Sequence, residues 1–373
     1  MAAIIEARTL ITVSTACLSS PRWRQKVFTV QSLEYQWIDA FLYAMVRGDD
    51  WAAFELQLFQ GLACAAEAAE TQMWADEAKV DEAATAFRYD RDLLTTEETM
   101  AWLEHAGLTL EDWTDFLART VLRDEWSIRL PTLVDRHRAN FVITDANFAA
   151  EGLCSPMFRQ FATTLAGRAA LAATLDPSEG TSAGRPFRIA KLISRFARWL
   201  DGFDSDELAQ RLSHLSHVET HFLASAEAAR TDQALQLQVS RNRLEWMRVD
   251  LERLSFPNAD AAREAAMCVR EDGLTLTDVG LESRQMIRDT AHILERLEPE
   301  LRDAVLSATV DELIGPIQIG DRFELAMMVG KDPADLSDSL VRARAEEAVI
   351  EQLMSKAILA HVRWAERVRA PSA

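Results

Sequence analysis

In the sequence LEWMRVDLERL at residues 244–254, apolar and charged residues roughly alternate. Alternation with a period of two is typical of a strand that buries one face. The sequence after it predicts, in order, a helix over 259–270, a helix that begins after Gly273, a helix over about 292–308, a Gly-Pro turn at 315–316 and a strand over 323–329. This order predicts a small α+β unit within a chain whose patterning is otherwise helical.

Three motifs in this unit resemble those of parvulin-type (PpiC-like) peptidyl-prolyl isomerases. They are ELRDA at 300–304, GPI at 315–317 and FELAM at 323–327. Glu324 stands where the family's last strand carries a histidine, and no histidine occurs over 241–256, where the first strand should carry the other. The resemblance therefore implies a degenerate parvulin-like domain that keeps the scaffold but lacks both histidines of the catalytic hydrogen-bond network.

The same resemblance suggests where a polypeptide would bind. Leu297 and Leu301 match two apolar residues, four positions apart, that floor the family's proline pocket. We expect peptide contacts from five residues: Leu297, Leu301, Phe323, Glu324 and Met327. Spacing alone favours the alternative that Leu297 and Leu301 are ordinary core residues. An apolar cup without the polar groups would bind peptide without accelerating isomerisation.

A second resemblance lies in the motif TTEETMAWLEHAGLTLEDW at 95–113. Thr95 or Thr96 suits an N-cap, Gly107 suits a C′ position, and Thr109 with Asp112 forms a capping-box variant. This arrangement is similar to the N-terminal helical module of SurA-type chaperones. In those proteins the module precedes parvulin domains, and a final helix packs back on it.

We therefore predict a mainly α protein with a small α+β domain. A SurA-like helical module is expected at 1–243, a degenerate parvulin-like domain at 244–333, and a C-terminal helix at 334–373 that packs on the module with Trp364 as an anchor. Within the module, a short hairpin is one interpretation of residues 1–30, and helical patterning begins at Ser32. The Gly-, Pro- and Ser-rich stretch at 176–186 is predicted to be a loop or an internal linker.

Composition limits the partners and the compartment. Of 373 residues, 49% are apolar and 27% charged, which is typical of a globular chain. A net charge of −19 argues against nucleic acid and anionic membranes as partners. No apolar run is long enough to span a membrane, and no secretory signal is recognised. Four widely spaced cysteines, none in a CxxC motif, predict reduced thiols in the cytoplasm.

One group of histidines has the spacing of a metal site. His214, His217 and His221 lie at helical spacing and could share one face, as metal ligands do, but a histidine-rich polar face is the favoured interpretation. The chain has no nucleophile elbow, Walker A, GxGxxG or HExxH motif. We predict no cofactor, no metal and no catalytic residue.

Ten tryptophans are present, and seven of them fall within residues 23–126. Such enrichment suits a groove that holds extended peptide, although a large helical core is the default interpretation.

Among the SurA- and parvulin-type proteins that this chain resembles, cytoplasmic members with the same layout occur beside pathways that make ribosomal peptides such as crocagin. The leading hypothesis is a non-catalytic, chaperone-like protein that binds a precursor peptide for pathway enzymes. One alternative is an active peptidyl-prolyl isomerase, and another is a regulatory scaffold that binds a second biosynthetic protein.

Overall fold

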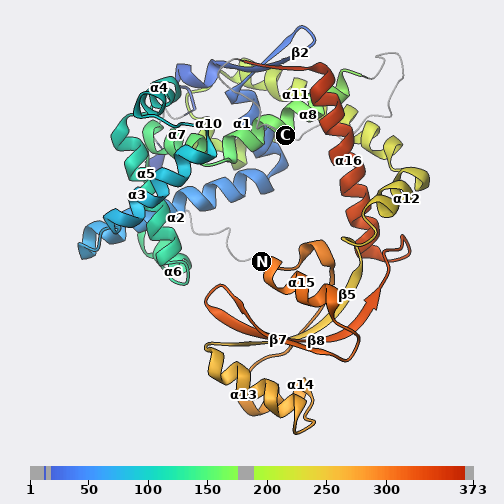
Figure 1. Ribbon diagram of the computed structural model, residues 1–373. Coiled ribbons are helices and arrows are strands. Elements are labelled where there is room, and N and C mark those ends of the chain that lie inside the picture. The colour runs from blue at the N-terminus through green and yellow to red at the C-terminus, as the bar shows by residue number, and fades with distance from the viewer. Residues whose placement is uncertain (1–11, 14–17, 175–188, 366–373) are drawn as a thin grey trace. The chain divides into compact units, whose positions relative to one another are not determined.

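The computed structural model describes residues 12–13, 18–174 and 189–365 (Figure 1). Two compact units are present, Met1–Ser225 with Met354–Ala373, and Ala226–Leu353. The helices α11 (Ser205–Ala229) and α16 (Ser339–His361) contribute to both units. The predicted class, a mainly helical chain with a small α+β part, is confirmed. The predicted division at residues 243 and 333 stays a prediction.

The first unit is built mainly of helices (Figure 1). They are α1 (Trp37–Arg47), α2 (Asp49–Thr71), α3 (Glu77–Asp90), α4 (Thr96–Ala106), α5 (Leu110–Glu125), α6 (Leu130–His137), α7 (Asp145–Cys154), α8 (Met157–Ala172), α9 (Ile189–Arg195) and α10 (Ala197–Leu200), with the short 3-10 helices η1 (Pro21–Arg24) and η2 (Arg138–Asn140). Among the described helices of the chain, none combines the length with the hydropathy that a bilayer span requires. The predicted loop at 176–186 lies outside the described residues.

The helix boundaries predicted over 95–113 are confirmed. Thr95 caps α4 in a capping box with Glu98, and Gly107 ends that helix with φ +64°. Thr109 caps α5, and Asp112 completes the second box. These boundaries could be predicted because a cap depends on residues only three positions apart.

The prediction that helical structure begins at Ser32 is wrong. Residues 26–36 form a hairpin of β2 (Lys26–Val30) and β3 (Leu33–Gln36), and α1 begins only at Trp37. Aromatic residues outweigh the helical spacing here, because Phe28 and Tyr35 stack across the hairpin with ring centroids 4.8 Å apart. The strand β9 (Val362–Trp364) pairs with β2, which places Trp364 opposite Phe28. A further two-stranded pair joins β1 (Thr12–Val13) to β4 (Val142–Ile143).

Four of the nine tryptophans of the first unit, Trp23, Trp51, Trp113 and Trp199, are buried in its core. Trp23, Trp51 and Trp199 are at most 2% exposed and pack edge-on or tilted against phenylalanines from α1, α2, α7 and α8. Phe158, fully buried at the start of α8, lies 4.4 Å from Phe41 between ring centroids. The default interpretation of the tryptophan enrichment therefore holds for these residues.

The second unit contains a four-stranded antiparallel sheet in the order β6-β5-β8-β7 (Figure 1). Its elements are α12 (Asp232–Arg241), β5 (Arg248–Phe256), α13 (Ala259–Arg270), α14 (Leu276–Ser283), β6 (Arg288–Ile293), η3 (Leu294–Arg296), α15 (Pro299–Ser307), β7 (Leu313–Ile319) and β8 (Arg322–Asp332). Helices α13 and α14 cover one face of the sheet, and α15 covers the other.

Three predictions for this unit need correction. The expected helix over 292–308 is a strand end, η3 and then α15, because Pro299 suits the first turn of a helix and begins it there. The first strand begins at Arg248, four residues later than expected. The Gly-Pro pair lies inside β7 at a bulge instead of forming the turn before the strand. Gly315 has φ +102°, and a Cβ there would lie 2.6 Å from the backbone oxygen of Glu324.

Candidate functional site

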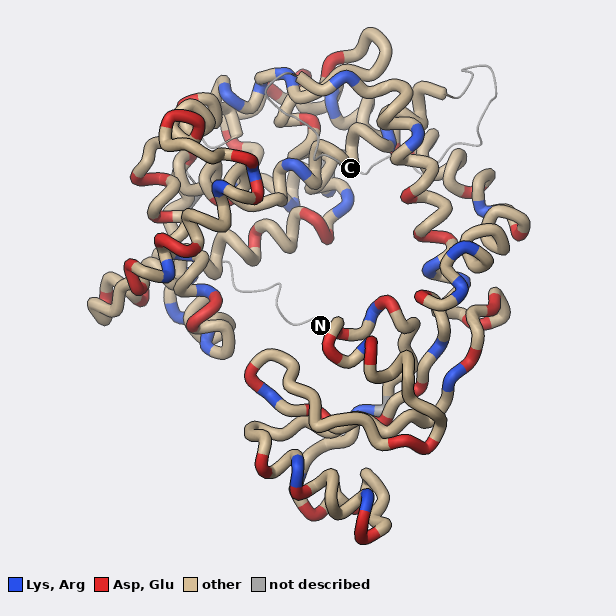
Figure 2. Tube along the Cα trace, in the orientation of Figure 1, with Lys and Arg blue, Asp and Glu red and all other residues tan. Residues whose placement is uncertain are grey.

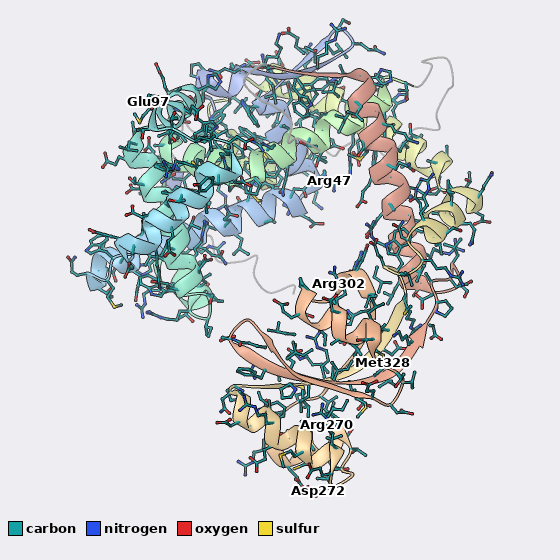
Figure 3. The ribbon with its side chains drawn as sticks, in the orientation of Figure 1. Arg47, Glu97, Arg270, Asp272, Arg302 and Met328 are labelled. Carbon is teal, nitrogen blue, oxygen red and sulfur yellow. The ribbon has the colours of Figure 1, made fainter. Side chains whose placement is uncertain are left out.

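Leu297 and Leu301 lie in the core on the α15 face of the sheet. Their exposed fractions are 2% and 1%, and they belong to a cluster with Val249, Leu251 and Met328. Figure 3 marks Met328 on β8, below α15. Both leucines thus occupy the core positions that spacing alone favours, and in this arrangement neither presents a surface to a ligand.

The other predicted contact residues do not converge on one surface. Phe323 and Met327 pack with the core between the sheet and α13 and α14. Glu324 lies between them in sequence and points to the opposite, α15 face, together with Met328. Side chains alternate across a strand, so residues at odd and even positions of β8 serve different faces. Whether any of the five contacts a peptide stays a prediction.

Glu324 forms a buried ion pair with Arg253 on β5. The residues are 7% and 6% exposed. Arg253 Nε donates to Glu324 Oε2 at 2.7 Å, and Nη2 donates to the same oxygen. Arg288 Nη2 on β6 donates to the other carboxylate oxygen at 3.3 Å. The Glu324 carboxylate is therefore held by two guanidinium groups.

Further polar groups extend this pair along β6 and to the start of α15. Arg253 Nη2 also donates to Glu298 Oε1 at 3.2 Å. Thr290 and His292 stand opposite Leu251 and Val249 in the strand pairing, so they share the α15 face. We call these residues the polar cluster: Arg253, Arg288, Thr290, His292, Glu298 and Glu324.

Three atoms of the polar cluster are buried without a hydrogen-bond partner. They are Thr290 Oγ1, His292 Nε2 and Glu298 Oε2. Most buried polar side-chain atoms in native proteins are hydrogen-bonded, so each exception needs an explanation. Burial, and next the positive charge of Arg253, lower the pKa of His292 below its ordinary value of 6.5. A neutral imidazole can accept or donate one hydrogen bond at Nε2.

The loop that carries Glu298 is braced by Arg302 on α15, which Figure 3 marks. Arg302 Nη2 donates to the backbone oxygens of Glu295 at 2.7 Å and Leu297 at 3.0 Å. Glu298 is the N-cap residue of α15 and Pro299 its first residue. Both the leucine core and these backbone contacts hold the Glu298 carboxylate near β5.

Sequence reasoning identified Glu324 but missed the rest of the polar cluster. In the segment RDTAHI at 288–293, the polar Thr290 and His292 alternate with the apolar Ala291 and Ile293, and Thr290 and Ile293 are β-branched, which is a strand signal. The sequence prediction placed His292 in a helix, so it was not expected to lie on the same face of the sheet as Glu324. Arg253 was visible only as one charge in an alternating strand.

No protein-family model matches the chain, and no curated protein matches it. Among solved structures it is similar to several PrsA proteins, three of which follow. The foldase PrsA of Streptococcus pneumoniae is 13% identical, with a TM-score of 0.25 over 59% of this chain and 91% of that one. PrsA of Bacillus subtilis is 10% identical, with a TM-score of 0.22 over 58% and 87%. The foldase PrsA of Lactococcus lactis is 12% identical, with a TM-score of 0.26 over 56% and 85%. TM-scores of this size do not establish a common overall arrangement, so function must be inferred from this chain's own residues.

The histidine series on α11 does not gather into a metal site. His214 Nε2 lies 3.0 Å from the Tyr35 hydroxyl, while the rings of His217 and His221 lie 4.1 Å apart. Within the described part of the chain, the metal-ligand atoms that do gather belong to Glu67, Glu70 and His137.

In the group of Glu67, Glu70 and His137, the Glu67 carboxylate is already hydrogen-bonded to other side chains of the chain. Glu67, 2% exposed, accepts from Arg129 at 3.0 Å and Arg136 at 2.8 Å, and lies 2.9 Å from His137 Nε2. The hydrogen bond with His137, together with the two arginines, outweighs burial and lowers the pKa of Glu67. Two guanidinium groups around one carboxylate disfavour a cation, so this group has a structural explanation.

The histidines predict how stability depends on pH. Burial lowers the pKa of His214, His221 and His292 below 6.5 in the folded protein. The unfolded chain then binds more protons than the folded one as the pH falls through about 6.5, so the free energy of unfolding should decrease from about pH 7 to about pH 5.5. Urea unfolding at several pH values measures this slope.

The variant His292→Leu tests the contribution of His292 to this pH dependence. His361→Gln is its control, because His361 is exposed at the end of α16. The slope should become shallower only in His292→Leu. A pH-independent free energy of unfolding over this range would contradict the prediction.

Proposed function

We propose that this protein binds an extended polypeptide at the polar cluster of its four-stranded sheet and acts as a chaperone-like component without isomerase activity. The three unpartnered buried atoms of the polar cluster support the proposal, and the cluster reaches the surface through the side chains of Glu298 and Arg288, which are 41% and 55% exposed. A peptide bound there would reach the three atoms by displacing the side chains that cover them. A buried polar group without a hydrogen bond costs about 1–3 kcal/mol. A peptide backbone offers alternating N–H donors and C=O acceptors, so it can supply partners to a hydroxyl, an imidazole and a carboxylate together.

The absence of catalysis is proposed from the positions of the other groups. Prolyl isomerisation needs an apolar cup for the proline ring and polar groups that favour the twisted amide, whose barrier is about 20 kcal/mol. Leu297 and Leu301 are packed in the core, and two arginines engage Glu324. These positions support ground-state binding more than stabilisation of a transition state.

The identity of the polypeptide is a finer proposal. The resemblance to SurA- and parvulin-type proteins beside ribosomal-peptide pathways supports a precursor peptide as the ligand, in the cytoplasm. Peptides encoded by neighbouring genes are the first to titrate. If only a folded pathway enzyme associates, the scaffold alternative replaces this proposal.

Binding at the polar cluster is tested with a fluorescein-labelled, proline-containing neutral peptide and fluorescence anisotropy. The double variant Thr290→Val with His292→Leu removes two unpartnered groups and leaves no partner stranded. Each lost hydrogen bond is worth about 0.5–1.5 kcal/mol, so we expect the dissociation constant to rise at least about fivefold.

Thr277→Val is the matched control, because Thr277 is exposed on α14 at the other side of the sheet. It should bind as the wild type does. Equal affinity of wild type and double variant would show that the peptide does not use the polar cluster.

A protease-coupled assay on the same peptide separates binding from catalysis. When the protein is added in excess, we expect the time constant of cis-to-trans isomerisation to stay at its uncatalysed value, tens to hundreds of seconds at 25 °C. Acceleration that rises in proportion to protein concentration would establish the isomerase alternative.

A further inference from the structure

The first unit contains a cavity of about 1750 Å³ that the proposed function does not use. Its walls come from η1, β2, the start of α1, the end of α3, α4, the start of α8 and β9. Sites for small molecules usually enclose about 300–1,000 Å³. A larger, partly open cavity suits several residues of a polypeptide better than one small ligand.

The charge of the cavity differs from that of the whole chain. Acidic and basic residues are interspersed along both units (Figure 2), and the net charge is −19. Five basic residues line the cavity against three acidic ones: Arg22, Lys26, Arg91, Arg159 and Arg363, with Asp90, Asp92 and Glu98. Arg159 and Arg363 are exposed, and neither forms an ion pair with any described residue. The other three basic residues are paired, Arg22 with Asp145, Lys26 with Glu34 and Arg91 with Asp90. The two exposed, unpaired arginines therefore favour ligands with carboxylates.

Two of the lining arginines have buried nitrogens without a hydrogen-bond partner. Arg91 has a side-chain exposure of 10%; Nη2 donates to the backbone oxygen of Cys154 at 2.6 Å, while Nε has no partner. Arg22 Nη2 donates to the backbone oxygen of Gly107 at 3.1 Å, while Nη1 has no partner. Both guanidinium groups also form ion pairs within the chain: Arg91 Nη1 lies 3.0 Å from Asp90 Oδ2, and Arg22 Nε lies 3.3 Å from Asp145 Oδ2. Arg159 and Arg363, which have no such pair among the described residues, are therefore the lining guanidinium groups best suited to a ligand's carboxylates.

Aromatic rings complete the walls. Trp37, Trp102 and Trp364 are half-buried there, so part of each indole faces away from the packed core. Such rings bury a large area at a low cost in side-chain entropy, and they bind extended peptides in several recognition modes. The acidic field of the chain disfavours nucleic acid, which offers the other common ligand for arginine and tryptophan together.

We infer that this cavity is a second polypeptide site, specific for an extended segment that alternates acidic with apolar side chains. The inference rests on the proposed function, because it takes the ligand to be a polypeptide. The carboxylates would pair with Arg159 and Arg363, and the apolar side chains would lie against the tryptophans.

The test uses the full-length protein and two fluorescein-labelled peptides of roughly eight residues, which extend to about 27 Å. One peptide alternates glutamate with leucine, and the other alternates lysine with leucine. The cavity variant is Arg159→Glu with Arg363→Glu, and the matched control is Lys191→Glu with Arg198→Glu. The control residues are exposed in α9 and α10, outside the cavity, and the control changes the net charge equally.

We expect the glutamate peptide to bind the wild type and the control equally, and the cavity variant at least roughly tenfold more weakly. The lysine peptide should bind the wild type at least tenfold more weakly than the glutamate peptide. Equal affinity of the cavity variant and the control for the glutamate peptide would overturn the inference, as would equal binding of the two peptides to the wild type.

The neutral proline peptide distinguishes this inference from the proposed function. If that peptide still binds at the polar cluster while the cavity variant has no effect on the glutamate peptide, the second site is wrong and the proposed function stands. If no peptide binds the wild type, both are wrong.

Discussion

Replacing Glu324 with glutamine is expected to lower the free energy of unfolding by about 3–5 kcal/mol. The carboxylate is 7% exposed and is the main partner of the 6%-exposed Arg253 guanidinium. An amide of the same shape leaves Arg253 as a buried cation whose remaining acidic partner is Glu298, at 3.2 Å from Nη2. Desolvation of that charge is then largely uncompensated, which is why breaking a buried pair costs more than the pair contributes. Urea unfolding followed by circular dichroism measures the loss.

Two variants separate this effect from a general effect of charge. Glu347→Gln removes an exposed ion pair with Arg296, in which both side chains are about half exposed, and should cost less than about 1 kcal/mol. The double variant Arg253→Met with Glu324→Leu replaces the buried pair with apolar side chains and should recover most of the stability lost by Glu324→Gln. If the double variant loses as much free energy of unfolding as Arg253→Met and Glu324→Leu lose together, the two residues do not act as a pair.

The extent to which this structure follows from sequence depends on how far apart the interacting residues lie. The helix over 259–270 has its predicted bounds, and the caps at Thr95 and Thr109 are where they were predicted. Each of these signals lies within a few residues of the boundary that it sets. The α+β character of the second unit followed from the alternation over 244–254, for the same reason.

Features that depend on strand pairing were not predictable in this way. The pair Arg253 and Glu324 is separated by 71 positions, and only the register of β5 with β8 brings the two side chains together. The same register places Phe323 and Met327 on the face opposite Glu324. A list of consecutive strand residues therefore mixes two surfaces unless the buried face is known. The cavity of the first unit likewise combines β2, α4 and β9, which lie far apart in the chain.

Gly152→Ala is expected to destabilise the first unit by about 3 kcal/mol, the upper end of the usual cost of overpacking a core. A Cβ at Gly152 would lie 2.1 Å from Phe158 Cζ and 2.2 Å from both Cε atoms. The ring of Phe158 is fully buried and contacts Phe41, Phe54 and Phe148, with centroids 4.4, 5.2 and 5.1 Å away. Because the clash involves the body of a packed ring, relief requires several aromatic side chains to move. The midpoint of urea unfolding, measured by tryptophan fluorescence, should fall. The slope of the free energy of unfolding against urea concentration should change little.

Gly61→Ala provides the matched control, because its Cβ would approach Arg119 and Glu151 no closer than 3.4 Å. Gly61 lies in the interior of α2, where alanine gains up to about 1 kcal/mol in helix propensity, so this variant should be neutral or slightly stabilising. If the clash causes the loss, adding Phe158→Leu should make Gly152→Ala less costly than it is in the wild type, since the smaller side chain leaves room for the methyl group. A cost for Gly152→Ala below about 1 kcal/mol would instead mean that the aromatic core can rearrange around the added methyl group.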